Sequence, residues 1–176
     1  MKAIVYTSNT GNSERYSKLL AQQIGLPVYS LAQAKKILPS DTEIIYFGWV
    51  MAGKIKGYVS AIKKFKILAV CAVGMSQSGS QIEILRNKNN ISDGIVLFSL
   101  QGNLDIKKLH GIYRLMMNIM VKIVVKELEK KKNCTLEEKD MLEMMLNEND
   151  KVKAENLKPV VDWFNNVANG EFNELI

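Results

Sequence analysis

Five short apolar runs, separated by helical or turn-forming stretches, constrain the fold of this chain more than any other feature. The runs occupy residues 3–6, 27–29, 43–50, 67–74 and 94–100. The third run does not alternate polar and apolar side chains, which indicates a strand buried on both faces of a parallel sheet. Strands that alternate with helices predict an open, parallel, doubly wound α/β sheet with helices on both faces. In such a sheet, ligands are expected beyond the carboxyl ends of the strands.

The first run leads into a polar stretch, residues 7–13, directly before a helical pattern. Backbone N–H groups in the first turn of a helix lack partners, and the helix dipole adds partial positive charge, so an anion is stabilised there. The hydroxyls of Ser8, Thr10 and Ser13 add donors, and Gly11 lets the backbone curl around the anion. The stretch matches neither the nucleotide-triphosphate loop nor the dinucleotide loop. A capping loop that binds nothing is the alternative.

This stretch resembles the phosphate loop of flavodoxins, in which an aromatic residue precedes a Ser/Thr-rich turn. The matching residues are Tyr6, Ser8, Thr10, Gly11, Asn12 and Ser13. The resemblance implies a flavodoxin-like fold and FMN as the cofactor, with its phosphate held without lysine or arginine. Two later loops are implied to contact the flavin ring. The cofactor-binding residues implied in all three loops are Ser8, Asn9, Thr10, Gly11, Asn12, Ser13, Trp49, Val50, Met51, Ala52, Gly53, Met75, Ser76, Gln77, Ser78 and Gly79.

The two later loops are expected at residues 49–57, followed by a helix to about residue 66, and at residues 74–80. The resemblance implies that Trp49 stacks on the flavin, and a packing aromatic is the alternative. The loop at 74–80 lacks the aromatic and acidic residues that are common in the family, so it offers no ring for stacking. A flexible peptide that bonds the flavin N5–H is expected at one of three glycines, Gly48, Gly53 or Gly57.

Beyond residue 101 the chain continues further than a short flavodoxin does, with a helical extension over about 104–150. We expect a Met-rich helix over 104–132 and a helix over 135–146 that begins with a Thr135/Glu138 capping box. A closing helix is expected over 155–168, with Trp163 beside an apolar face formed by Leu157, Val160, Val161 and Phe164. No linker separates domains, so residues 1–176 are interpreted as a single domain.

Two further segments indicate a narrower group within the flavodoxin-like proteins. They are residues 102–105 (Gly-Asn-Leu-Asp) and the basic, Met-rich residues 113–117. They are similar to flavodoxin-domain proteins related to the menaquinone-dependent protoporphyrinogen oxidase. This resemblance implies an FMN-dependent electron-transfer protein or a quinone-linked oxidoreductase, with a redox partner protein or a quinone as its partner, and it raises a role in haem synthesis. A regulatory or binding module that keeps the fold without the flavin is the alternative function.

Charge is distributed unevenly along the chain. Residues 1–132 contain 20 Lys and Arg against 8 Asp and Glu, a net +12, whereas residues 133–176 contain 4 against 10, a net −6. The lysines occur in scattered pairs without an aromatic platform, so no nucleic-acid partner is expected. The net positive charge of residues 1–132 suits an acidic redox partner or an anionic membrane surface. Residues 104–132 are the candidate contact. The alternative is that the helices over 135–168 fold back and cover that segment.

The remaining features bear on compartment and catalysis. Lys2 leads straight into a strand, so no signal peptide is evident and a cytoplasmic location is expected, with membrane association through 104–132 as an extension. The two cysteines, Cys71 and Cys134, are widely spaced and suggest neither a disulfide nor a metal cluster. His110 is the only histidine, and no Ser/His/Asp or Cys/His arrangement is evident around it in the sequence. Reactivity is therefore expected to reside in the cofactor, and no catalytic side chain is predicted.

Overall fold

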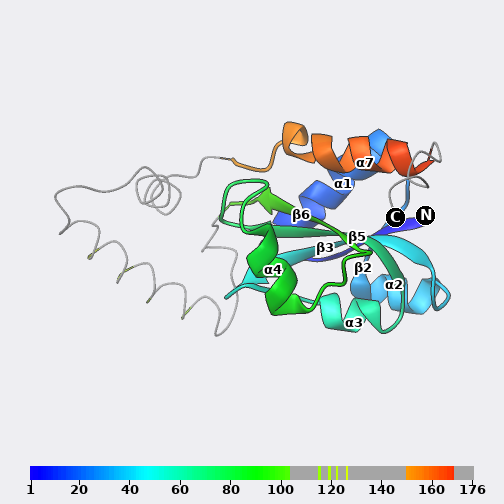
Figure 1. Ribbon diagram of the computed structural model, residues 1–176, viewed down its shortest axis with the longest axis horizontal. Helices are drawn as coiled ribbons and strands as arrows, with labels where there is room; N and C mark the ends of the chain where they lie inside the picture. The colour runs from blue at the N-terminus through cyan, green and yellow to red at the C-terminus, as the bar shows by residue number, and fades with distance from the viewer. Residues whose placement is uncertain (104–114, 116–118, 120–121, 123–125, 127–149, 169–176) are drawn as a thin grey trace.

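The computed structural model describes residues 1–103, residues 115, 119, 122 and 126, and residues 150–168. Strands and helices alternate through most of the first range (Figure 1). In chain order the elements are β1 (Ala3–Thr7), α1 (Asn12–Ile24), β2 (Val28–Ser30), α2 (Leu31–Ile37), β3 (Glu43–Met51), β4 (Lys54–Ile55), α3 (Tyr58–Ile62), β5 (Lys66–Gly74), α4 (Ile82–Asn89), β6 (Val96–Gln101), the 3-10 helix η2 (Ala154–Leu157) and α7 (Lys158–Ala168).

Five of the strands form a parallel sheet in the order β2-β1-β3-β5-β6, and β4 pairs antiparallel with the end of β3. This is the doubly wound order of flavodoxin-like folds, in which the chain builds the sheet outward in both directions from β1 and β3. The predicted α/β class and parallel sheet are therefore confirmed. Helices lie on both faces, with α1 and α7 on one and α2, α3 and α4 on the other (Figure 1).

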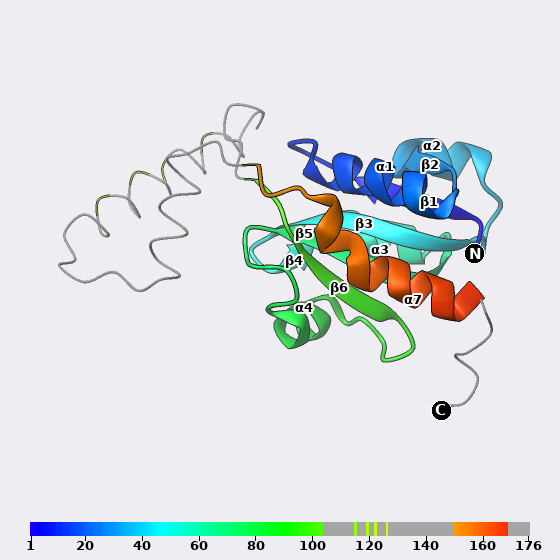
Figure 2. The ribbon, with the colours of Figure 1, turned by 90° about the horizontal axis from the view of Figure 1, so that it is seen from above.

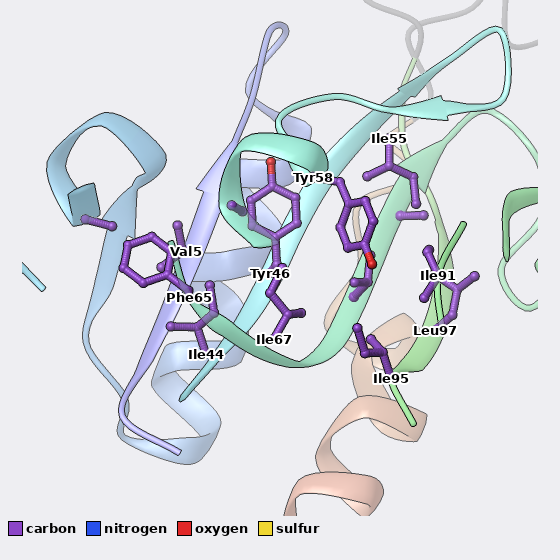
Figure 3. Packing of buried hydrophobic residues seen from close by; sticks show 14 of the residues in the cluster. Val5, Ile44, Tyr46, Ile55, Tyr58, Phe65, Ile67, Ile91, Ile95 and Leu97 are labelled. Atoms are coloured by element: carbon purple, nitrogen blue, oxygen red, sulfur yellow. The ribbon is translucent and has the colours of Figure 1, made fainter. Parts of the chain in front are cut away.

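Each face of the sheet has its own apolar core, because successive strand residues point to opposite faces. In β3, Ile44 and Tyr46 face the α2–α3–α4 layer, whereas Ile45 and Phe47 face the α1–α7 layer. All four are completely buried, as expected for a central parallel strand. Figure 3 shows the first of these cores, which also contains Tyr58 from α3.

The predicted loop over residues 49–57 is wrong in its first part. β3 continues to Met51, and a two-residue turn at Ala52 and Gly53 leads into β4. Both turn residues have positive φ, 51° and 76°, which is the conformation that a tight hairpin requires. The helix expected to reach residue 66 is also shorter. It ends at Ile62, because Lys66 pairs with Glu43 and opens β5.

The closing helix is confirmed as η2 followed by α7, which lies along the sheet beside α1 (Figure 2). Leu157 and Val160 are buried as predicted, and Trp163 is also buried, with its ring edge-on to Phe98 at 6.0 Å between centroids. This apolar face packs on the sheet. The expected covering of residues 104–132 by the helices over 135–168 concerns residues that lie mostly outside the described part of the chain.

The Met-rich helix over 104–132 lies outside the described residues except at four positions, which are helical. The helix expected over 135–146, with its Thr135/Glu138 capping box, lies outside them entirely.

Candidate functional site

The candidate site lies at the edge of the sheet where the parallel strands end (Figure 1). β1, β3, β5 and β6 run in the same direction, so the segments that follow them reach the same edge. From β1 the chain moves outward to β2, and from β3 it moves outward to β5 on the opposite side. A doubly wound sheet binds its ligands at such a point of divergence.

Residues 8–11 form the turn that starts α1. The N–H of Gly11 donates to Ser8 Oγ at 3.1 Å, and the Gly11 carbonyl accepts the N–H of Arg15 at 2.9 Å. Gly11 has φ 92°, a left-handed conformation that other residues rarely adopt, and a Cβ placed on it would meet nothing within 4 Å. Its backbone angle, rather than a close neighbour, therefore requires glycine here.

Two side-chain donors beside this turn are buried without a hydrogen-bond partner in the described part of the chain, Asn9 Nδ2 and Ser13 Oγ. Ser13 is completely buried and lies in the first turn of α1. A buried polar group without a partner costs about 1–3 kcal/mol. The first-turn N–H groups likewise lack intrahelical partners and carry the positive end of the helix dipole. These donors together fit a bound anion.

The side chain of Asn12 forms hydrogen bonds within the protein. Its Nδ2 donates to Thr10 Oγ1 at 3.3 Å and to the carbonyl of Asn103 at 2.6 Å, and the residue is 8 % exposed. This contact joins the loop after β1 to the segment after β6. Because Thr10 Oγ1 accepts a bond, its own proton remains to be donated. Asn12 therefore offers a ligand its backbone N–H and not its amide.

Trp49 belongs to β3 rather than to a loop, and it is half-buried. Lys56 Nζ lies 5.9 Å from the centroid of its indole, within the range of a cation–π contact, and the N–H of Lys56 donates to the Trp49 carbonyl at 2.9 Å. A cation and an aromatic ring thus lie together at the β3–β4 hairpin. The other four residues predicted here divide between strand and turn, with Val50 and Met51 in β3 and Ala52 and Gly53 in the turn.

Gly48, Gly53 and Gly57, the candidates for a flexible peptide, all have backbones constrained by pairing or hydrogen bonds. The Gly53 carbonyl accepts a hydrogen bond from Asn89 Nδ2 at 2.8 Å. The Gly57 carbonyl accepts two N–H groups of α3, at 3.1 and 2.9 Å. Gly48 lies inside the ladder, paired with β1 on one side and β5 on the other. The geometry therefore gives no support to a flexible peptide at these glycines.

The loop over 74–80 is fastened to β6. The N–H of Gln101 donates to Ser78 Oγ at 3.0 Å, and the N–H of Gly79 donates to the Ser99 carbonyl at 2.9 Å. Ser78 and Gly79 therefore stabilise the conformation of the loop. Both residues are exposed. Of the other residues predicted here, Gln77 is exposed, and two are half-buried, Met75 and Ser76.

A polar network that the sequence did not predict joins α1 to the segment before η2. The Arg15 guanidinium donates two hydrogen bonds to the Asp150 carboxylate, at 3.1 and 2.6 Å. Asn103 Nδ2 donates to the same carboxylate at 2.9 Å, and Asn103 Oδ1 accepts the N–H of Lys151 at 2.6 Å. The bonds from Arg15 and then Asn103 hold the pKa of Asp150 well below its usual range.

Tyr16 extends this network into the core. Its hydroxyl is hydrogen-bonded to the Gln101 carbonyl at 2.6 Å and to Asn156 Nδ2 at 2.7 Å. These contacts join residues that are far apart in sequence, so no local sequence pattern predicts them. They hold Asn103 and Asp150 together beside the candidate site.

A scan against protein-family models, a search of curated proteins and a search of solved structures each found no match for this chain. The function is therefore inferred from the fold and the site. Within the described residues, no helix combines the length and apolar character needed to cross a bilayer.

Proposed function

We propose that this chain is a flavoprotein that holds FMN at the carboxyl edge of its sheet and exchanges electrons with a redox partner protein or a quinone. The observation that carries the proposal is the pair of buried donors, Asn9 Nδ2 and Ser13 Oγ, beside the first turn of α1. The strand order supports it, since flavodoxin-like folds bind FMN where the sheet diverges between the first and third strands.

The donors around Gly11 suit the phosphate of FMN. Residues 8–13 contain no lysine or arginine, and the guanidinium of Arg15, on the first turns of α1, is bound to Asp150. A phosphate would therefore be held by backbone N–H groups and by the hydroxyls of Thr10 and Ser13. An open left-handed glycine at the end of the turn, Gly11, leaves space for such a group.

The segment after β3 would adjoin the flavin ring. Bound FMN supplies one- and two-electron redox chemistry, while the chain positions it and sets the charge around it. Lys54 and Lys56 lie on the hairpin, and no Asp or Glu occurs between Glu43 and Glu83. The positive charge of these lysines favours the acceptance of electrons at this place.

The first test is the absorption spectrum of the purified chain, with FMN fluorescence titration of the ligand-free protein. We expect a yellow protein that releases FMN on denaturation and quenches FMN fluorescence on rebinding. A colourless protein that leaves FMN fluorescence unchanged would instead be a flavin-free module with this fold.

A matched pair of serines on α1 tests the phosphate loop itself. Ser13 and Ser17 are both completely buried, but Ser17 Oγ donates to the Glu14 carbonyl at 2.7 Å, whereas Ser13 Oγ has no partner in the described residues. Ser13→Ala should weaken FMN binding about tenfold to a hundredfold, because a hydrogen bond to a charged group contributes roughly 1.5–3 kcal/mol.

The same substitution should raise the unfolding free energy of the ligand-free protein, since it removes an unpaired buried hydroxyl. Ser17→Ala should lower the unfolding free energy and leave FMN affinity unchanged. If Ser13→Ala binds FMN as tightly as the wild-type chain does, Ser13 is not part of the site.

A further inference from the structure

The turn between β3 and β4 has a conformation that its own sequence does not favour. Ala52 and Gly53 both have positive φ, and the second suits glycine, but an alanine in the left-handed region is strained. β4 is two residues long and pairs with β3 through only Val50↔Ile55 and Met51↔Lys54. So short a ladder is a weak constraint, and something else must hold the turn.

Asn89, the last residue of α4, supplies that constraint. Its Oδ1 accepts the N–H of Ile55 at 2.8 Å, and its Nδ2 donates to the Gly53 carbonyl at 2.8 Å. The same Nδ2 donates to the Leu85 carbonyl at 2.8 Å, which fixes the amide on its own helix. The residue is 9 % exposed, so these bonds are shielded from water. Asn89 therefore bonds to both sides of the hairpin at once.

The lysines beside Asn89 reinforce the contact. Lys54 Nζ donates to the carbonyl of Lys88, and the Lys88 side chain lies against Gly53. Figure 2 shows β4 beside α4, the helix that carries these groups. The turn is thus attached to α4 as well as to the sheet.

We propose that Asn89 is a positioning residue, which holds residues 51–54 in place at the edge of the candidate site. This inference rests on the proposed function in one respect, that the turn adjoins bound FMN. Because the Gly53 carbonyl accepts a hydrogen bond from Asn89, it is not available to bind a ligand. The turn therefore has a fixed conformation when the ligand binds. FMN affinity and the midpoint potential of bound FMN then depend on a side chain that lies on α4.

Three variants test this inference in the full chain. Asn89→Ala removes both bonds to the hairpin. Asn89→Asp keeps an oxygen for the N–H of Ile55 and loses the donor to Gly53, so it serves as a second variant if the alanine variant folds poorly. Asn87→Ala, an exposed asparagine on the same helix, is the matched control.

The first readout is amide hydrogen exchange of residues 51–56 in the ligand-free protein. Asn89→Ala should accelerate exchange at Ile55 by about tenfold or more, because its bond to Oδ1 is lost. Asn89→Asp should retain protection at Ile55, and Asn87→Ala should match the wild-type chain. Unchanged exchange at Ile55 in Asn89→Ala would overturn the role of Asn89 as the anchor.

The second readout is the FMN dissociation constant together with the midpoint potential of bound FMN. Both Asn89 variants should bind FMN several-fold more weakly and shift the potential, whereas Asn87→Ala should change neither. Faster exchange with unchanged affinity and potential would overturn the positioning role and leave a purely structural bond. Failure of the wild-type chain to bind FMN would overturn the proposed function, and hydrogen exchange would still decide whether Asn89 holds the turn.

Discussion

Tyr58 carries a buried hydroxyl for which the described residues supply no hydrogen-bond partner. The residue is 2 % exposed in the core beneath α3, and burial raises the pKa of its phenol (Figure 3). Tyr58→Phe removes the unpaired hydroxyl and keeps the ring. We expect the free energy of unfolding to rise by about 1 kcal/mol or more, measured by urea denaturation.

Tyr46 is the matched control for this substitution. It lies in the same core, but its hydroxyl is hydrogen-bonded to Thr7 Oγ1 at 2.8 Å and to the Lys56 carbonyl at 2.7 Å. Tyr46→Phe should therefore lower the free energy of unfolding by about 1 kcal/mol or more. Equal losses in the two variants would show that the Tyr58 hydroxyl is satisfied after all.

Trp49 is the aromatic residue whose place bears most directly on the flavin ring. It is half-buried at the end of β3, beside Lys56. If it stacks on FMN, Trp49→Ala should weaken binding about fivefold and abolish part of the fluorescence quenching, since stacking contributes roughly 1 kcal/mol. Trp49→Phe should retain most of both.

Trp163 is the control for general effects of losing an indole. It is buried against Phe98 on the α7 side of the sheet, so Trp163→Phe should affect stability and leave FMN quenching intact. Unchanged quenching in Trp49→Ala would make Trp49 a packing residue.

At the scale of elements, Asp150 joins α1 to the segment before η2. Its pKa is depressed in the folded chain by the bonds from Arg15 and Asn103, so its contribution to stability is present above the unfolded-state pKa of about 4 and is lost as the pH falls through the folded-state value. Asp150→Asn should lower the free energy of unfolding at pH 7 by about 1 kcal/mol, because the pair is bidentate but half-exposed.

The comparison of urea denaturation at pH 7 and pH 3 checks the sign. The difference between Asp150→Asn and the wild-type chain should shrink at pH 3, where the carboxylate of the unfolded chain is largely protonated. Asp162→Asn, which removes an exposed pair with Lys158 on α7, should have a smaller effect at pH 7. A penalty for Asp150→Asn that is constant across this range would exclude an electrostatic origin.

Elements that depend on local pattern were predictable from the sequence, and those that depend on distant contacts were not. Apolar runs and the turn residues that bound them predicted β1, β3, β5 and the start of α1. The hairpin at Ala52 was missed, because a strained alanine gives no turn signal and Asn89 holds the turn from a distance of more than thirty residues.

The candidate site divides in the same way. Ser8 and Gly11 form the turn before α1, and Ser13 lies in the first turn of the helix. The three residues lie together because they are neighbours in sequence at a helix start, which is a local property. Asn12 Nδ2 donates to the Asn103 carbonyl, and Ser78 Oγ accepts the N–H of Gln101 in β6. Both hydrogen bonds depend on which strands lie side by side. Sequence periodicity specifies which face of a strand is buried, but not which loop a polar side chain will reach.

For the molecule as a whole, charge and exposed apolar groups bear on its partner. Leu115 and Ile119 are 61 % and 53 % exposed, and Lys122 and Lys126 are exposed as well. All four positions are helical, and their spacing of four, three and four residues places them on one face. A helix face with aliphatic and basic side chains suits an anionic lipid surface.

We therefore expect the chain to co-sediment with vesicles of phosphatidylcholine and phosphatidylserine at low salt, and to be released by salt. The double substitution Lys122→Glu and Lys126→Glu should reduce this binding by about thirtyfold or more, since each lysine near the surface contributes roughly 1 kcal/mol. Lys63→Glu with Lys64→Glu changes the net charge by the same amount at the end of α3 and should reduce binding much less. Equal losses in both would indicate attraction by net charge alone, and sedimentation with neither these vesicles nor neutral ones would direct the search to an acidic protein partner instead.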